Sequence, residues 1–214
     1  FTNENLEVPF PRLTYADAML YYGTDKPDLR NPIKIVDVTD IFDGSGFSLF
    51  AKLIASKSAV VRAIPGPKCG SRSVADRMNS WAQGEGAPGM GYIIYGDGEA
   101  KGPVASALGK EKSEEIKNRL GLKDGDAAFF SCSNEKEAAD LAGKARVKMG
   151  IDQGIFETKG YKFCWIVDFP MYELDEKGKV EFSHNPFSMP QGGLEALKSE
   201  NPLDIKAWQY DLVC

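Results

Sequence analysis

A regular alternation of apolar and amphipathic segments between Ile35 and about Gly150 constrains the fold of this chain more than any other feature. The run DAAFFSCS (126–133) has the length and composition of a buried strand, and NEKEAADLAGKARVKMG (134–150) has the spacing of an amphipathic helix. Helices and strands that alternate in this way pack as helices layered on one sheet. The sequence therefore predicts a compact α+β module in the middle of the chain.

Four further segments of the module carry their own patterns. Two apolar runs, FSLFAKLI (47–54) and AVVRAIPG (59–66), are separated by polar turn residues and predict a β-hairpin. The segments that follow predict a helix in SRSVADRMNSWAQGEG (71–86), with Val74, Met78 and Trp81 on one face, a strand running into a Gly-rich turn in GYIIYGDGE (91–99), and a helix in KSEEIKNRLG (112–121).

The segment before the module predicts a helix and then a boundary. TYADAMLYYG (14–23) is helical in pattern, with Thr14 as its cap, Asp17 in the capping-box position usually held by Glu, and Gly23 as its end. GTDKPDLRNP (23–32) contains two prolines that cannot continue the helix. This polar segment is therefore expected to separate the module from what precedes it.

The segment after Gly160 returns to strands. YKFCWIVDFPMYELDEKGKVEFSH (161–184) predicts an apolar strand, a turn at DEKG (175–178) and an alternating strand that ends at His184, and KAWQYDLVC (206–214) predicts a last strand. The simplest topology is a module inserted into a larger sheet-based host. Because the last strand carries apolar side chains that need neighbours, we expect the chain to be a piece of a longer protein.

The composition limits the classes of function. With 43% hydrophobic residues, 27% charged residues and a net charge of −5, the chain of 214 residues is typical of a globular protein without a generally basic surface. Four cysteines form no C-x-x-C pair and there is a single histidine, so we expect no metal site. We also expect reduced thiols, a cytoplasmic location and no membrane span.

The single histidine lies in VEFSHNPFSMP (180–190). Pro186 and Pro190 restrict the loop that follows His184, and Phe187 and Met189 are expected to anchor that loop by burial. One interpretation is an imidazole held at the rim of a pocket, where it can donate to a carboxylate. The other is a surface or core histidine with no ligand, which the residues alone favour.

Three other segments carry candidate chemistry. Asp168 ends the strand in CWIVDFP (164–170) and is either a carboxylate on a pocket floor or a strand-end acceptor of backbone N–H groups. The charged run GTDKPDLR (23–30) is either a polar strip near a substrate or an RNA end, or a mutually paired turn fixed by Pro27. IPGPKCGSR (64–72) opens a helix with basic residues, but it lacks both phosphate-loop spacings and disfavours phosphate binding.

Four segments together resemble a known family. TYADAMLYYGTDKPDLRNP, KFCWIVDFPMYE, HNPFSMP and KAWQYDLV, in this order around a module of this size, are similar to bacterial-type aspartyl-tRNA synthetase, a class II enzyme. The resemblance covers essentially the whole chain. It implies an α+β fold in which a two-layer α/β insertion of the GAD type interrupts an antiparallel catalytic sheet. The implied domains are catalytic pieces at 1–32 and 159–214 and the insertion at 33–158.

The resemblance also implies a site. By position, His184 matches the first histidine of the family's His-His-Pro-Phe-Thr motif, which contacts bound L-aspartate. Asn185 replaces the second histidine and Ser188 the threonine, which casts doubt on any role that needs a second imidazole and indicates a subgroup that charges both aspartate and asparagine tRNAs. Asn185 and Asp168 are then expected to hold His184 in position without contacting L-aspartate themselves. No catalytic or metal-binding residue is expected in this chain.

The implied reaction activates L-aspartate with ATP to aspartyl-adenylate and transfers it to tRNA(Asp), and to tRNA(Asn) in the subgroup. ATP and Mg²⁺ are expected to bind the full-length enzyme, a homodimer, through motifs outside these 214 residues. The chain alone is expected to be inactive and to bind no cofactor. The alternative is a non-catalytic GAD-type module with a structural or tRNA-contacting role.

Overall fold

The computed structural model describes residues 6, 8–56, 59–157, 159–175, 177–199 and 201–214. The chain divides into two compact units: the central unit, Leu20–Thr24 with Arg30–Thr158, and the flanking unit, Phe1–Met19, Asp25–Leu29 and Lys159–Cys214. Helix α1 (Tyr15–Tyr22) contributes residues to both. Parts of the sequence predictions, at 1–5, 7, 158 and 176, lie outside the described residues.

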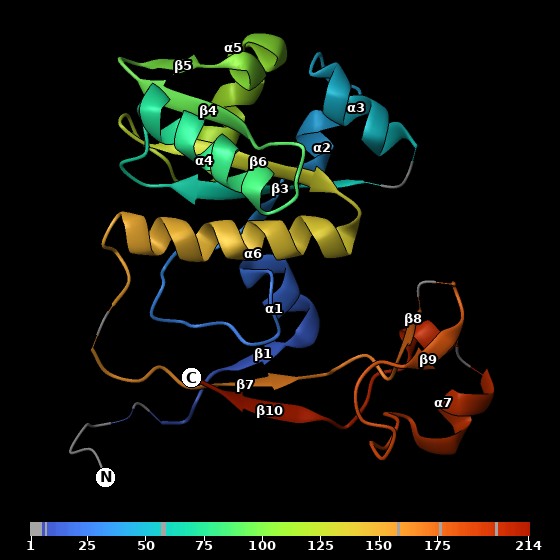
Figure 1. Cartoon of the computed structure of the whole chain (residues 1–214). Coiled ribbons are helices and arrows are strands. Elements are labelled where there is room, and N and C mark those ends of the chain that lie inside the picture. The colour runs from blue at the N-terminus through green and yellow to red at the C-terminus, as the bar shows by residue number, and fades with distance from the viewer. Residues whose placement is uncertain (1–5, 7, 57–58, 158, 176, 200) are drawn as a thin grey trace. The chain divides into compact units, whose positions relative to one another are not determined.

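The central unit is built on one antiparallel sheet with the strand order β2-β3-β6-β4-β5 (Figure 1). In chain order its elements are β2 Val36–Asp37, α2 Thr39–Phe42, α3 Ser48–Ala55, β3 Val60–Gly66, α4 Arg72–Gly84, β4 Gly91–Gly96, β5 Glu99–Lys101, α5 Pro103–Arg119, β6 Ala127–Ser133 and α6 Glu135–Asp152. The α+β class and the strand at 126–133 are as predicted. The longest predicted helix, at 134–150, corresponds to α6.

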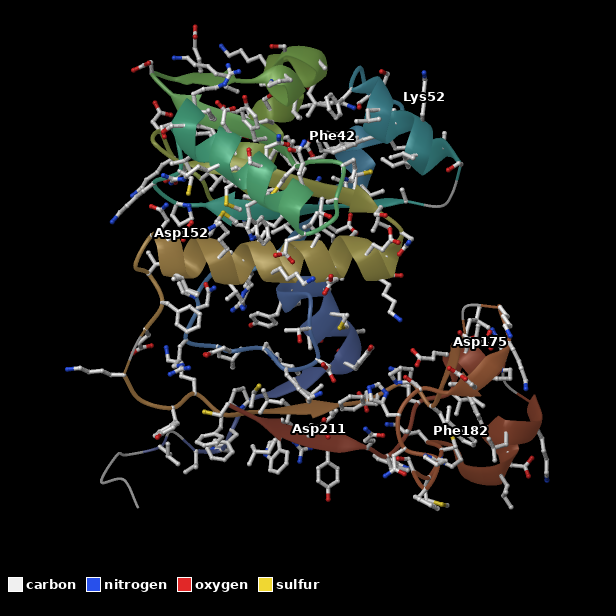
Figure 2. All side chains as sticks on the ribbon, in the orientation of Figure 1. Phe42, Lys52, Asp152, Asp175, Phe182 and Asp211 are labelled. Atoms are coloured by element: carbon white, nitrogen blue, oxygen red, sulfur yellow. The ribbon has the colours of Figure 1, made fainter. Side chains whose placement is uncertain are left out.

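Helices cover both faces of this sheet, so the predicted two-layer arrangement is wrong. Along β6, Ala127 and Phe129 pack with α4 and α6, whereas Ala128 and Phe130 pack with α2, α3 and α5. Successive side chains of a strand point to opposite faces, and both sets are fully buried here. Figure 2 labels Phe42 of α2, whose ring lies 5.2 Å from that of Phe130. The unit therefore has three layers.

The predicted hairpin at 47–66 is also wrong, because its first half is the helix α3. Leu49, Phe50, Leu53 and Ile54 are spaced as neighbours on one side of a helix, and Phe50 is the buried member. The apolar run is too short for its spacing alone to distinguish a helix from a strand. The second half is β3, which pairs with β2 and β6.

The hairpin of the central unit lies instead at β4–β5. Asp97 and Gly98 join the two strands with positive φ angles of 57° and 73°. Two successive residues with positive φ are typical of a type I′ turn, whose twist matches that of the strands it joins. The sequence GDGE, predicted only as a Gly-rich turn, thus reverses the chain within the sheet.

Helix α6 contacts the segment that leads into β2. Gly143 approaches the backbone of Gly23 so closely that a β-carbon on Gly143 would lie 2.9 Å from the carbonyl oxygens of Tyr22 and Gly23. Arg146 of the same helix is 1% exposed, and its guanidinium lies 4.8 Å from the centre of the Tyr22 ring. The close approach at Gly143 and the buried guanidinium of Arg146 therefore hold this lead-in segment against α6.

The flanking unit contains a three-stranded sheet in the order β1-β7-β10 (Figure 1). Its elements are β1 Arg12–Thr14, the start of α1, β7 Cys164–Val167, β8 Tyr172–Leu174, β9 Val180–Phe182, α7 Gly193–Ser199, a 3₁₀ turn Pro202–Asp204 and β10 Tyr210–Val213. β10 is antiparallel to β7, as predicted, but β1 is parallel to β7. The sheet is therefore mixed rather than purely antiparallel.

Thr14 caps the start of α1, as predicted, with a bond between the Thr14 and Asp17 side chains where a capping box has one to the backbone N–H of the cap residue. Thr14 Oγ1 accepts from the Asp17 backbone N–H at 3.0 Å and donates to the Asp17 carboxylate at 2.8 Å. At the other end Gly23 has a φ of 69°, as a helix-ending glycine does. This local chemistry sets the position of Tyr15, the first residue of the helix.

The chain before the predicted turn at DEKG (175–178) forms two strands, β7 and β8, with a break between them, where one apolar strand was predicted. Asp168 follows β7 with a φ of 57°, a conformation rare for residues other than glycine, and the chain turns before β8 pairs with β9. The second strand of the predicted pair stops at Phe182, two residues before His184. Among the described residues, no helix is both long and apolar enough to cross a membrane.

Candidate functional site

His184 packs on two aromatic rings of the flanking unit. Its ring centroid lies 5.0 Å from that of Phe169 and 5.8 Å from that of Tyr15, with interplanar angles of 76° and 79°. Both angles correspond to edge-to-face contacts, which restrict the plane of the ring. The side chain is nevertheless exposed, so His184 is a supported surface imidazole rather than a core histidine.

The neighbouring residue Ser183 contacts the imidazole directly. Ser183 Oγ lies 2.8 Å from His184 Nδ1, within hydrogen-bonding distance. The backbone N–H of Ser183 donates to the carbonyl of Met171 at 3.1 Å, which fixes the serine beside the start of β8. One ring nitrogen of His184 is therefore occupied by a partner from its own chain.

The loop after His184 is held differently from the prediction. Phe187 and Met189 do not anchor it by burial, because Phe187 is 90% and Met189 65% exposed. Hydrogen bonds hold the loop instead. Asn185 Oδ1 accepts from the Phe187 backbone N–H at 2.9 Å, and Ser188 Oγ donates to Gln209 Oε1 at 3.2 Å. Asn185 thus caps its own turn, and the hydrogen bonds of the described residues do not join it to His184.

Asp168 is partly buried beside a cavity. Its Oδ1 accepts from Gln191 Nε2 at 2.8 Å, and the same amide nitrogen lies 3.2 Å from the carbonyl oxygen of Ala207. The Asp168 carboxylate thus lines the cavity and accepts from a side-chain amide. Sequence patterns held no signal for Gln191, since the contact joins loops distant along the chain.

The cavity has a volume of about 420 Å³ and lies on one face of the three-stranded sheet. Three aromatic side chains and four charged or amide side chains form most of its walls. The lining residues are Arg12, Trp165, Val167, Asp168, Gln191, Trp208, Gln209 and Tyr210. His184 does not line this cavity.

The strand register places His184 and the cavity on opposite faces of the sheet. Trp165 and Val167 of β7 line the cavity, whereas Cys164 and Ile166, whose side chains point the other way, pack with Phe169 beneath α1. His184 contacts Phe169 and therefore belongs to the α1 face. Asp211 of β10, labelled in Figure 2, pairs with Ile166 in the ladder and is on this face too.

The surroundings of Tyr15 are acidic. Burial, followed by the negative charges of Asp25 and Glu173, raises the pKa of the Tyr15 hydroxyl. Asp25 also pairs with Lys26, whose ammonium lies 2.6 Å from its carboxylate. Part of the charged run 23–30 is therefore a mutually paired turn, and its first carboxylate is close enough to Tyr15 to act on it electrostatically.

Around the basic helix start at 64–72, backbone N–H groups already donate to side chains of the same chain. Ser71 caps α4 by accepting from the Val74 backbone N–H at 3.4 Å, and the buried Asp126 carboxylate accepts from the backbone N–H groups of Lys68 and Lys123 at 2.9 and 3.0 Å. These backbone donors are the groups that a phosphate would need. The geometry agrees with the sequence pattern in disfavouring a phosphate site.

In the described part of the chain, no three His, Cys, Asp or Glu side chains gather as a metal site would require. The aromatic partners of His184 were missed by the sequence analysis. Tyr15 was placed only as a helix residue and Phe169 was not singled out. No pattern in the sequence marks them, because the contacts join α1, the break after β7 and the loop after β9.

A family model described as tRNA synthetases class II (D, K and N) matches residues 2–214. Three curated relatives carry the name aspartate–tRNA(Asp/Asn) ligase. The relative from Cereibacter sphaeroides is 53% identical over 216 residues, which cover 99% of this chain and 36% of that protein. Those from Acidiphilium cryptum and Paramagnetospirillum magneticum are 56% and 57% identical, each over 96% of this chain but only 35% and 24% of their own length.

The chain thus spans about a third or less of the length of these relatives. The match extends over both compact units, since it begins at residue 2 and ends at residue 214. The chain belongs to the class II tRNA synthetases of the D, K and N group.

Proposed function

We propose that these 214 residues are the central part of an aspartate–tRNA ligase. The full-length enzyme activates L-aspartate with ATP to aspartyl-adenylate and transfers the aspartyl group to tRNA(Asp) and tRNA(Asn). The observation that carries this proposal is the identity of 53 to 57% with relatives named aspartate–tRNA(Asp/Asn) ligase over nearly the whole chain. Because a third of an enzyme lacks most of the reaction's machinery, the chain alone is inactive.

The proposal assigns the segments 1–32 and 159–214 to the catalytic domain and the segment 33–158 to a GAD insertion. The division of the chain into a flanking unit and a central unit with its own sheet supports an inserted module. ATP, Mg²⁺ and the homodimer contacts belong to the full-length cytoplasmic enzyme. In this assignment the flanking unit supplies one wall of the amino-acid site.

His184 is the proposed contact to L-aspartate. An exposed imidazole with one nitrogen held by Ser183 retains a free nitrogen for a ligand. Its position on the α1 face, where Asp25 and Glu173 supply negative charge near Tyr15, suits a zwitterion with both a carboxylate and an ammonium group. Asn185 supports the loop, and Asp168 acts on the turn that carries Phe169.

Substitution of His184 in the full-length enzyme tests this role. His184→Ala is expected to raise the KM for aspartate at least about tenfold, because a hydrogen bond to a charged ligand is worth about 1.5–3 kcal/mol. The KM for ATP should change little in the same pyrophosphate-exchange assay. An unchanged aspartate KM would reject the aspartate-binding role. Lys198→Ala, which alters an exposed side chain of α7 outside the loop, serves as the control.

The second candidate is a structural or tRNA-contacting role for the central unit. It is favoured by the separate core of that unit. Charge reversal of exposed lysines on α6, such as Lys136→Glu, in the full-length enzyme tests it. A salt-sensitive loss of tRNA affinity with unchanged aspartate activation would favour tRNA contact, and unchanged affinity would favour a structural role.

A further inference from the structure

We propose that Ser183 is a positioning residue for His184: its hydroxyl donates to Nδ1 of the imidazole and thereby keeps the ring proton on Nε2, where it is donated to a carboxylate of the bound amino acid. This inference rests on the proposed aspartate-binding role of His184. It adds a residue that the resemblance to the synthetase family does not assign.

The geometry supplies the contact. Ser183 Oγ and His184 Nδ1 are 2.8 Å apart, a normal length for a hydrogen bond to a hydroxyl. A neutral imidazole has one donor nitrogen and one acceptor nitrogen, and the bond made by one nitrogen decides the role of the other. A serine hydroxyl can donate or accept, and the proposal assigns it the donor role, which leaves the ring proton on Nε2.

The ligand chemistry requires the serine to donate. An ionised carboxylate can only accept hydrogen bonds, so the nitrogen that faces it must carry the proton. With the proton on Nε2, Nδ1 is an acceptor and Ser183 is its donor. The opposite tautomer would direct a lone pair at the carboxylate, which is repulsive. The serine therefore selects the form of His184 that binds an acidic amino acid without adding charge.

The surroundings hold both partners in place. The Ser183 backbone is tied to Met171 by a 3.1 Å hydrogen bond, and the imidazole is packed on Phe169 and Tyr15. Phe169 is fully buried, and the ring of Tyr15, the first residue of α1, lies 5.2 Å from that of Phe169. The ring plane is thus set by packing, and the serine has only to set the tautomer.

The single histidine makes a direct test possible. In the 214-residue chain labelled with ¹⁵N, the two ring nitrogens give the only imidazole signals, and their ¹⁵N shifts report which one carries the proton. At about pH 8.5, where an ordinary imidazole is neutral, the wild-type chain is expected to show the Nε2–H tautomer almost exclusively. Ser183→Ala should move the two ¹⁵N chemical shifts toward the values of a mixture of both tautomers. Ser183→Thr, which retains the hydroxyl, should restore the wild-type spectrum.

The matched control is Ser188→Ala. It removes a hydroxyl from the same loop, but that hydroxyl donates to Gln209 rather than to the imidazole. The tautomer should stay that of the wild-type chain. Ser183→Gly is a second hydroxyl-free variant should Ser183→Ala fail to fold, which the dispersion of the amide signals would reveal.

Kinetics of the full-length enzyme link the tautomer to binding. Ser183→Ala is expected to raise the KM for aspartate about fivefold with little change in kcat or in the KM for ATP, the effect of one neutral hydrogen bond. Ser183→Thr should recover most of the loss. An unchanged tautomer in both hydroxyl-free variants overturns the positioning role of Ser183, whatever the kinetics.

The outcomes separate the two proposals. If Ser183→Ala alters the tautomer but His184→Ala leaves the KM for aspartate unchanged, the aspartate-binding function fails, and with it the link from tautomer to ligand. If His184→Ala raises the aspartate KM but Ser183→Ala changes neither tautomer nor KM, only the role of Ser183 fails. A wild-type spectrum dominated by the Nδ1–H tautomer also overturns the inference.

Discussion

Asn31 and Arg146 bind each other's backbones reciprocally. The side-chain amide of Asn31 donates to the carbonyl of Arg146 at 2.9 Å, and the Arg146 guanidinium donates to the carbonyl of Asn31 at 2.7 Å. Arg146 also donates to the carbonyl of Ile33 at 2.6 Å. Both side chains are 1% exposed. A buried cation is thus satisfied by backbone oxygens of the segment that leads into β2.

This arrangement predicts that Arg146→Leu strongly destabilises the protein. The substitution leaves the carbonyls of Asn31 and Ile33 buried without that donor, and losing one partner of a buried charged network costs about 3 kcal/mol or more. Urea unfolding measures the change. Arg77→Leu, on the exposed surface of α4, is the control and should change the free energy of unfolding by less than about 0.5 kcal/mol. Equal effects of the two substitutions would contradict the prediction.

Gly143→Ala is predicted to destabilise the protein although alanine favours helices. The new β-carbon would lie 2.9 Å from the carbonyl oxygens of Tyr22 and Gly23, which are backbone atoms that cannot rotate away. We expect a loss of about 2 kcal/mol, as for overpacked cores. Gly84→Ala, in α4 with open space around it, should be neutral or stabilising by up to about 1 kcal/mol. Thermal unfolding of both variants gives the comparison, and the same sign for both would refute the close approach.

The Asp40–Arg119 pair is predicted to contribute stability that depends on pH. Two hydrogen bonds of 2.7 and 2.9 Å from Arg119 lower the pKa of Asp40 below its ordinary 3.8. Because the folded-state pKa is the lower one, the contribution is full at neutral pH, shrinks near pH 3.8 and is lost below the folded-state pKa. Asp40→Asn should cost less than about 1 kcal/mol at pH 7, since the pair is exposed and screened by solvent.

The measurement for this pair is urea unfolding of the wild-type chain and Asp40→Asn across the acidic range. The difference between them should close as the pH falls, and also at high salt. Asp43→Asn, a nearby exposed carboxyl, is the control. A difference that stays constant down to pH 2 would show that Asp40 acts through packing instead.

Cys69 and Cys132 are predicted to be poorly reactive thiols. Burial, together with the charge of Asp126 at Cys69, raises the pKa of both to about 11, so only about 0.1% is thiolate at pH 8. Cys214 is exposed. Iodoacetamide should therefore alkylate Cys214 first in the folded protein, as peptide mass spectrometry can show. Rapid alkylation of Cys69 at pH 8 would contradict its burial, and unfolding in urea should make all sites react.

Much of the local structure follows from the chain itself. The Thr14 cap of α1 and the helix end at Gly23 formed as their residues indicate, because each involves neighbours a few positions apart. The long helix α6 also follows from its apolar spacing. The family matched by the whole chain is the one that the order of four short motifs indicated. His184 and Asp168 were singled out by their sequence context alone.

Tertiary structure decided the rest. The covering of both sheet faces depends on where distant helices pack. The helix α3 became evident only from the packing of Phe50 on the buried Phe42 and the partly buried Phe47. The sequence by itself singled out one imidazole, that of His184, and one carboxylate, that of Asp168. Only the fold could place them on opposite faces of one sheet, because a strand sends successive side chains to opposite sides and its register depends on its neighbours.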